Sequence, residues 1–215
     1  MKFSLIITAG GTSSRYGNKN KLLEKIGTKT VIEHSVEPFL NFCEISQIII
    51  SANISIIKDL KKIFNNKNIL IIEGGNTRQE SVYKALQEVS EEYVLIHDGA
   101  RPLVTEKIIK NIISLVQKRD AVSVMTKTTD TIKEVDENGR IIKTIDRSKL
   151  YNTQTPQAFK TELIRKAHNK LKDGNYTDDA SMLETLEIPV YIAEGSYTNI
   201  KITSKSDLDF AKIYI

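Results

Sequence analysis

Glycines and basic side chains follow the first apolar run of the chain, in an arrangement suited to holding a polyphosphate. Residues 3–8 read as a buried strand, and the glycines of Thr8-Ala9-Gly10-Gly11 come directly after it. Arg15, Lys19 and Lys21 follow closely. Glycine lets backbone N–H groups approach a phosphate, and nearby cations neutralise its charge. The pattern predicts a phosphate-binding loop, although a glycine-rich stretch alone is equally typical of a polar strand-to-helix connection.

Two well-known nucleotide-binding motifs do not fit this chain. The loop lacks the Gly-Lys-Ser/Thr ending of a P-loop, and Gly10, Gly11 and Gly17 do not match Gly-x-Gly-x-x-Gly. The next apolar run ends at Asn53, without the acidic residue that would bind the ribose of NAD. A dehydrogenase-like dinucleotide-binding protein is therefore disfavoured.

An acidic residue lies at the end of another apolar run. Residues 93–97 read as a buried strand, and Asp98 follows at its carboxyl end. The carboxyl ends of parallel strands meet at one sheet edge, so we expect Asp98 near the glycine loop, where one or two protein oxygens suffice for Mg²⁺. For an isolated aspartate at a strand end, capping a helix or pairing with Arg101 would be the favoured role, and the surrounding motifs reverse that preference. His97 is expected to be a buried strand residue rather than a base.

Strand and helix patterns alternate along the chain. Short apolar or alternating runs predict strands at 3–8, 46–51, 69–72, 93–97, 121–126 and 189–193. Helical spacing of apolar residues covers 30–42, 54–64, 77–88, 105–118, 160–172, 178–186 and 205–214. This alternation predicts an α/β fold with a mostly parallel sheet and helices on both faces.

One segment departs from this alternation of strand and helix patterns. Residues 127–147 contain two β-branched runs joined at Asn138-Gly139, a strong hairpin signal. We expect a β-hairpin arm at about residues 127–150, projecting from one domain that covers residues 1–215, since no linker or repeat divides the chain.

Composition excludes several classes of protein. The net charge of +4 is too small and too scattered to indicate nucleic acid, and no apolar stretch approaches the roughly 20 residues that cross a membrane. A single cysteine, Cys43, excludes an internal disulfide and a zinc ribbon, and fits a cytoplasmic protein. Arginine is scarce, with seven residues against 24 lysines. Four of these arginines lie in the motifs that follow.

Several different short motifs follow one another along the whole chain. They are Ala9-Gly10-Gly11 with Arg15 and Lys21, Gly74-Gly75-Asn76-Thr77-Arg78-Gln79-Glu80-Ser81-Val82, His97-Asp98-Gly99-Ala100-Arg101-Pro102, Asp130-Thr131, Asp146-Arg147, Gln154-Thr155-Pro156-Gln157, Thr177-Asp178-Asp179-Ala180-Ser181 and Asn199-Ile200-Lys201-Ile202-Thr203. Together they resemble the 2-C-methyl-D-erythritol 4-phosphate cytidylyltransferases of the non-mevalonate isoprenoid pathway. The resemblance implies a Rossmann-like nucleotidyltransferase fold, CTP and a polyol phosphate as substrates, Mg²⁺ or another divalent cation, and a homodimer formed through the arm.

The resemblance also assigns roles to residues. It implies that Arg15 and Lys21 contact the triphosphate and stabilise the transition state. Ser13 replaces the family's second loop glycine, and Asn20 stands where the family usually has proline before the lysine. The choice of Lys21 over Lys19 depends on a one-residue gap in this loop.

Three further groups of residues receive roles in the same way. The implied nucleotide-binding residues are Ala9, Gly10, Gly11, Gly75, Asn76 and Ser81. The residues implied to position the second substrate are Arg147, Lys201, Thr131, Thr177 and Arg101, of which Arg101 is alternatively a partner of Asp98. The implied metal ligands are Asp98 and, more weakly, Asn199. Asn76 stands where the family often has aspartate.

Two other functions remain to be distinguished. Ribitol-5-phosphate cytidylyltransferase shares the chemistry but usually departs in the Gly-Gly and His-Asp motifs. A non-catalytic nucleotide-binding protein is disfavoured because every charged position that the chemistry needs is filled. The sequence thus favours cytidyl transfer to 2-C-methyl-D-erythritol 4-phosphate.

Overall fold

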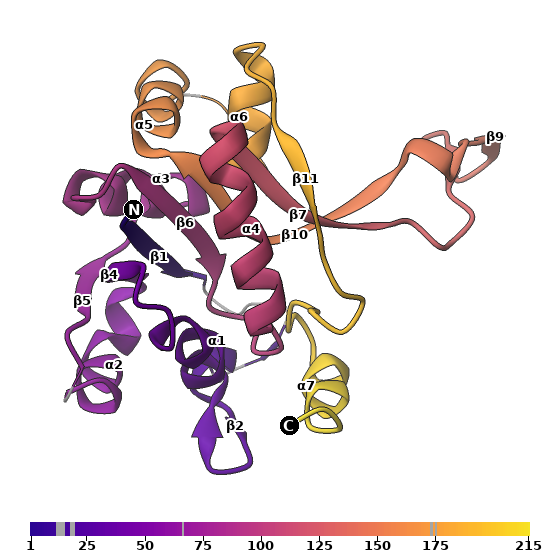
Figure 1. Ribbon diagram of the computed structural model, residues 1–215. Helices are drawn as coiled ribbons and strands as arrows, with labels where there is room; N and C mark the ends of the chain where they lie inside the picture. The colour runs from indigo at the N-terminus through magenta and orange to yellow at the C-terminus, as the bar shows by residue number, and fades with distance from the viewer. Residues whose placement is uncertain (12–15, 18–19, 66, 173, 175) are drawn as a thin grey trace.

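A central sheet of seven strands organises the described part of the chain, with strand order β11-β7-β10-β6-β1-β4-β5 (Figure 1). The computed structural model describes residues 1–11, 16–17, 20–65, 67–172, 174 and 176–215. The strands are β1 (Phe3–Ala9), β4 (Ile45–Ala52), β5 (Leu70–Glu73), β6 (Tyr93–Asp98), β7 (Ala121–Lys127), β10 (Tyr151–Lys160) and β11 (Tyr191–Glu194). β10 pairs antiparallel with β6 and β7, and the remaining pairs are parallel. The prediction of a mostly parallel sheet is confirmed.

Two apolar clusters cover the two faces of the sheet. The period-2 geometry of a strand sends Leu5 and Ile7 of β1 into one cluster and Ile6 into the other. The first cluster contains apolar side chains of α1 (Val31–Leu40), α2 (Ile57–Ile63), α4 (Glu106–Arg119) and α7 (Lys205–Ala211). The second contains those of α3 (Arg78–Glu88), α5 (Thr161–Lys170) and α6 (Asp179–Thr185). Helices therefore pack on both faces, as predicted.

Strand β10 is the element that the apolar pattern does not predict. It lies between β6 and β7, yet it carries the polar run Gln154-Thr155-Pro156-Gln157. Gln154, Thr155 and Gln157 are buried and hydrogen-bonded: the Gln157 amide, for example, donates to Ser123 Oγ at 2.9 Å and to Asp178 Oδ2 at 2.6 Å. A buried strand built from polar residues has no apolar signature, because its side chains are stabilised by hydrogen bonds that only the folded sheet supplies.

The β-hairpin arm is confirmed and projects from the body of the molecule (Figure 1). Its strands are β8 (Lys133–Val135) and β9 (Ile141–Thr144), which pair antiparallel. Gly139 takes φ +81° in the turn, a conformation that glycine adopts at no steric cost. The arm exposes several apolar side chains: Ile132, Val135, Ile141 and Ile142.

Smaller elements differ from the predicted ranges. A short hairpin, β2 (Lys25–Ile26) and β3 (Lys29–Thr30), precedes α1, and single 3-10 turns lie at η1 (Lys21–Leu23), η2 (Ile54–Ile56) and η3 (Arg147–Lys149). The predicted helix at 54–64 is η2 followed by α2, and the predicted helix at 205–214 ends at Ala211. In the described ranges, no helix has the length and apolar character needed to cross a membrane.

Candidate active site

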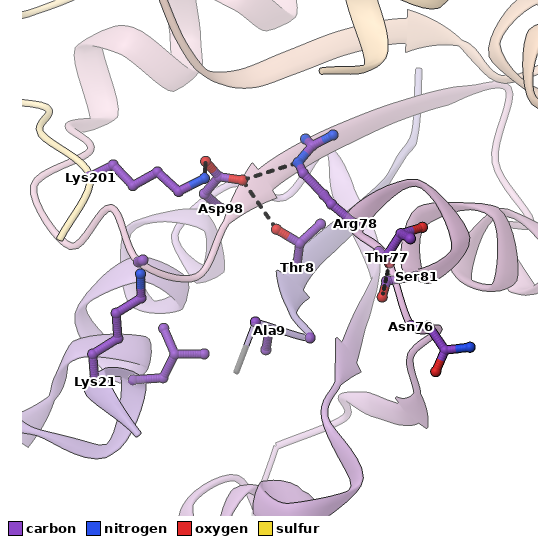
Figure 2. A pocket seen from close by; sticks show the side chains of 13 residues that line it. Thr8, Ala9, Lys21, Asn76, Thr77, Arg78, Ser81, Asp98 and Lys201 are labelled. Atoms are coloured by element: carbon purple, nitrogen blue, oxygen red, sulfur yellow. Dashed lines mark hydrogen bonds and ion pairs between the residues drawn. The ribbon is translucent and has the colours of Figure 1, made fainter. Parts of the chain in front are cut away.

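A pocket of about 280 Å³ lies at the carboxyl edge of the sheet, where β1 and β6 end side by side. In their parallel register Thr8 is opposite Asp98, so the glycine loop and the carboxylate meet as predicted. Figure 2 shows side chains from several separate segments of the chain around this space. The lining residues are Thr8, Ala9, Gly10, Gly11, Lys21, Leu22, Asn76, Thr77, Arg78, Ser81, Asp98, Ala100 and Lys201.

The Asp98 carboxylate is the electrostatic centre of the pocket. It is 5% exposed and receives a hydrogen bond from Thr8 Oγ1 at 3.2 Å. Its ion-pair partners among the described residues are Lys201 Nζ at 2.8 Å, and Arg78 Nε and Arg101 Nε, both at 3.5 Å. Arg101 is three residues from Asp98, whereas Arg78 and Lys201 come from segments far apart in the sequence and both lie beside this carboxylate (Figure 2).

This charge environment fixes the ionisation state of Asp98. Burial by itself would raise the pKa of the carboxyl, but Lys201, Arg78 and Arg101 more than offset that effect and hold the pKa far below its ordinary value. Asp98 is therefore an anion at every physiological pH.

Arg78 is a pocket residue that the sequence analysis did not assign to the site. It is the first residue of α3, and its guanidinium lies between Asp98 and Asp179 (Figure 2 shows the Asp98 side). Burial alone would lower the pKa of Arg78, and Asp179 and Asp98 together reverse this and raise it. The scarcity of arginine and its place in the Gly-Gly motif were the available signals.

The segment at residues 74–76, which contains the implied nucleotide-binding residues Gly75 and Asn76, is a tight turn built around Ser81. Ser81 Oγ accepts a hydrogen bond from Gly75 N at 3.0 Å and donates to the Thr77 carbonyl at 2.8 Å. A Cβ at Gly10 or at Gly74 would lie 2.8 Å from this hydroxyl, so a larger residue at either position would displace the Ser81 hydroxyl. Asn76 and Ser81 line the pocket, whereas Gly75 shapes the turn beside them.

The glycine loop contributes Ala9, Gly10, Gly11 and Lys21 to the pocket lining. Lys21 begins η1, and Asn20 caps that turn by accepting a hydrogen bond from Leu22 N. Figure 2 shows the Lys21 side chain on the same side of the pocket as Lys201. Arg15 and Lys19 lie outside the described residues, so their predicted roles stay predictions.

Arg101 and Asn199 contact each other behind the pocket, and neither residue lines it. Arg101 Nη1 donates to the Asn199 carbonyl at 2.7 Å. The Asn199 side chain is fully buried, and its Nδ2 donates to the Thr155 carbonyl at 2.9 Å. The structure therefore places Arg101 as a partner of Asp98, one of the two roles predicted for it, while phosphate contact by Arg101 stays a prediction.

Thr131, Arg147 and Thr177 do not line this pocket. Thr131 is exposed beside the arm, and Arg147 begins η3 at the base of the arm, where its guanidinium donates to the Thr129 carbonyl. Thr177 is exposed just before the N-cap of α6. Lys201 alone among the predicted polyol-phosphate residues reaches the pocket of its own chain.

The pocket, as far as the structure describes it, offers too few oxygen ligands to bind a hard divalent cation by itself, so substrate oxygens would have to supply the remaining ligands. Among the described residues, no group of three or more His, Cys, Asp or Glu side chains could hold a metal ion. Asp98 offers one ionised carboxylate at the pocket wall, which matches Mg²⁺ bound by one or two carboxylates plus substrate phosphates. Asn199 Oδ1 makes no hydrogen bond among the described residues, but the side chain is buried outside the pocket lining. Its ligand role stays a prediction.

His97 is confirmed as a buried strand residue. Its Nδ1 lies 3.0 Å from Thr155 Oγ1 and its Nε2 lies 3.2 Å from the Arg101 carbonyl. Thr155 Oγ1 also accepts a hydrogen bond from Asp98 N. Nε2–H donating to the carbonyl and Nδ1 accepting from Thr155 satisfy both nitrogens of a neutral ring.

A polyanion-binding pocket at the carboxyl edge of an α/β sheet, with glycines, lysine and one carboxylate, defines a nucleotide-binding protein of the nucleotidyltransferase class. The family model described as 2-C-methyl-D-erythritol 4-phosphate cytidylyltransferase matches residues 3–215. The chain belongs to this family, and it is a nucleotidyltransferase enzyme.

Individual relatives with this name align with the chain over most of their lengths. The chain is 39% identical to the 2-C-methyl-D-erythritol 4-phosphate cytidylyltransferase of Bacillus cytotoxicus, with 99% of this chain and 97% of that protein covered. It is 39% identical to the protein of the same name from Clostridium tetani, with 98% and 89% covered. The crystal structure of 4-diphosphocytidyl-2C-methyl-D-erythritol synthase from Anaerococcus prevotii superposes with a TM-score of 0.89 at 31% identity, with 99% and 95% covered.

We expect the stability of the protein to fall in mild acid because of His97. Burial lowers the pKa of His97 from its ordinary value of 6.5 to about 4. Between pH 6.5 and about pH 4 the imidazole is therefore protonated in the unfolded chain but neutral in the folded chain. The free energy of unfolding consequently decreases by about 3 kcal/mol as the pH falls through this range. Denaturant unfolding at several pH values measures this slope.

The variant His97→Gln should have a flatter profile across the same window, whereas His34→Gln, at a half-buried histidine on α1, should keep the wild-type slope. An unchanged slope in His97→Gln would contradict the assignment.

Proposed function

We propose that this enzyme transfers CMP from CTP to 2-C-methyl-D-erythritol 4-phosphate and releases pyrophosphate. One observation carries the proposal: the glycine loop, Lys21, the anionic Asp98 and Lys201 line one pocket at the edge of the sheet. That arrangement can bring two polyanions together, which is what the reaction requires. Family membership supplies the identity of the base and of the polyol, and it does not favour ribitol 5-phosphate as the acceptor.

The reaction is a displacement at the α-phosphorus. A phosphate oxygen of the polyol phosphate forms a bond to this phosphorus, and the bond to the oxygen that bridges to the β-phosphate breaks. The electron pair of that bond leaves with pyrophosphate, so no proton has to be removed from the attacking dianion. The protein's task is positioning and the stabilisation of developing negative charge.

Different residues contribute to this task. Lys21 and Arg15 stabilise charge on the triphosphate, and Lys201 holds the phosphate of the acceptor. Asp98 would hold Mg²⁺ or another divalent cation together with substrate phosphates, and such a cation supplies neutralising charge on the phosphoryl oxygens. Ala9, Gly10 and Gly11 support the triphosphate through backbone N–H groups, and Gly75, Asn76 and Ser81 border the cytosine.

We also propose a homodimer in which the arm completes the partner's site. The arm is a two-stranded hairpin with exposed Val135, Ile141 and Ile142, and two strands alone are marginally stable in water. None of the three predicted positioning residues Arg147, Thr131 and Thr177 lines the pocket of its own chain. This fits a dimer in which Arg147 and Thr131 of one chain complete the site of the other.

A cytoplasmic location accompanies the proposal. Its support is Cys43, which is exposed and free and fits a reducing compartment.

The substrate assignment predicts a clear preference in a pyrophosphate-release assay. With CTP and Mg²⁺, we expect turnover with 2-C-methyl-D-erythritol 4-phosphate and far less with ribitol 5-phosphate, because the acceptor pocket must fit the branched polyol. Chelation of the divalent cation should abolish turnover. Equal rates with both acceptors would overturn the substrate assignment, and hydrolysis or binding of CTP without transfer would indicate a non-catalytic role.

Replacing Lys21 tests the register of the glycine loop. Lys21→Ala should lower kcat by roughly a hundredfold while weakening CTP binding much less, because the ammonium acts mainly on transition-state charge. Steady-state kinetics and calorimetric titration with CTP measure the two effects. Lys19→Ala is the matched control and should retain most activity. A crippled Lys19→Ala beside a nearly silent Lys21→Ala would make Lys19 the catalytic lysine.

Mixing two inactive variants tests the shared site. Arg15→Ala and Arg147→Ala should each be inactive, yet a mixed dimer has one site without either arginine and one site with both. Random exchange of equal amounts makes about half of the dimers mixed, so activity should return to roughly a quarter of the wild-type value. No recovery despite demonstrated subunit exchange would mean that each chain builds its own site.

A further inference from the structure

A line of ionisable side chains runs from the pocket into the second apolar cluster. Asp98 faces Arg78 at the pocket, Arg78 faces Asp179, and Asp179 faces His168. Asp179 and His168 are each 1% exposed, and neither lines the pocket. The reaction proposed above uses neither of them, so their role requires a separate explanation.

Arg78 is shared unequally between the two carboxylates. Its Nη2 donates to Asp179 Oδ2 at 2.7 Å, the length of a strong charge-assisted hydrogen bond. Its Nε lies 3.5 Å from Asp98 Oδ1, which is too long for such a bond. The guanidinium is therefore anchored on Asp179 and faces Asp98 at a distance.

The backbone of Asp179 is held by hydrogen bonds to strand β10. The residue begins α6, and its backbone N–H, together with that of Ala180, donates to Gln157 Oε1. His168 Nε2 lies 3.4 Å from Asp179 Oδ1, and within the described ranges neither atom makes a hydrogen bond. Arg78 is consequently the side chain that donates to this buried carboxylate in the described structure.

Removing the charge of Asp179 would change which carboxylate holds Arg78. An uncharged residue attracts the guanidinium far less than Asp98 does, and the attraction between two charges grows as they approach. Arg78 would then close on Asp98 Oδ1, the oxygen that it already faces and that receives the hydrogen bond from Thr8 at the pocket, and this oxygen would be less available to the substrates. Arginine suits this arrangement because its planar fork can face two carboxylates at once.

We infer that Asp179 is a positioning residue of the active site, which holds the Arg78 guanidinium back from Asp98 and so keeps the Asp98 carboxylate available to the substrates. This inference rests on the proposed function of Asp98. Asp179 acts through Arg78 and touches no substrate.

Three variants test the inference by kinetics. Asp179→Asn should lower kcat by about 10- to 100-fold, the usual effect of losing a group that orients a ligand-binding residue, with KM for CTP little changed. Asp179→Glu keeps the charge and should recover most of the loss. Glu184→Gln removes one charge from an exposed position on the same helix and should behave as wild type. Thermal unfolding of each variant gives its folded fraction.

The nuclear magnetic resonance signal of the Arg78 Nε–H group gives a readout without substrate. This signal is assigned by its absence in Arg78→Lys. In Asp179→Asn it should move downfield and exchange more slowly, because Nε–H forms a shorter hydrogen bond to Asp98. In Asp179→Glu and Glu184→Gln it should stay near its wild-type position.

The outcomes separate the inference from the proposed function. Wild-type kcat and an unmoved Arg78 signal in folded Asp179→Asn would overturn the inference while leaving cytidyl transfer intact. Absence of cytidyl transfer in the wild type would overturn the proposed function, and the Arg78 signal would still test the positioning. If Asp179→Asn does not fold, Arg78→Lys decides, because lysine cannot face both carboxylates and should lose kcat with KM for CTP little changed. An Arg78→Lys enzyme with wild-type kcat would refute the inference.

Discussion

The ionised Asp98 carboxylate, buried at the end of β6, is the constraint on which the rest of the site depends. A buried charge without partners costs several kcal/mol, so the fold must bring cations to this point. They arrive from three segments: Arg78 at the start of α3, Arg101 after β6, and Lys201 near the C-terminal end of the chain. The convergence of these segments on one carboxylate also forms the walls of the pocket, so the electrostatic requirement and the binding site have a common origin.

The polar strand β10 supports this arrangement from below. Thr155 accepts the hydrogen bond of the Asp98 backbone and faces the ring of His97. Gln157 binds the start of α6, which carries Asp179 and so reaches Arg78. A polar strand in the middle of a sheet is stable only if each buried group is satisfied, and these bonds satisfy it while fixing the orientation of site residues. The orientation of the pocket residues therefore depends in part on residues that do not line the pocket.

The distribution of arginine and lysine follows from the same demands. Arg78 and Arg101 are partly buried, and each guanidinium faces several acceptors. The planar guanidinium suits this role because its N–H groups point in fixed directions toward more than one acceptor. Lys201 and Lys21 reach the pocket as flexible point charges, which suits the neutralisation of phosphate oxygens in varied positions. The apolar side chains of the arm are exposed in the described part of the chain, and their burial requires another surface.

The sequence by itself determined the α/β class, the hairpin arm and most of the pocket lining. Periodic apolar runs and glycine positions are local signals, and motifs at the ends of parallel strands must meet at one sheet edge. Hence Gly10, Lys21 and Asp98 were predicted to lie together, and the structure confirms it. Only the tertiary structure decided that β10 is a central strand and that Arg78 is shared between Asp98 and Asp179. These features depend on hydrogen bonds and ion pairs between residues as many as 101 positions apart, and no local pattern of hydrophobicity records such pairings.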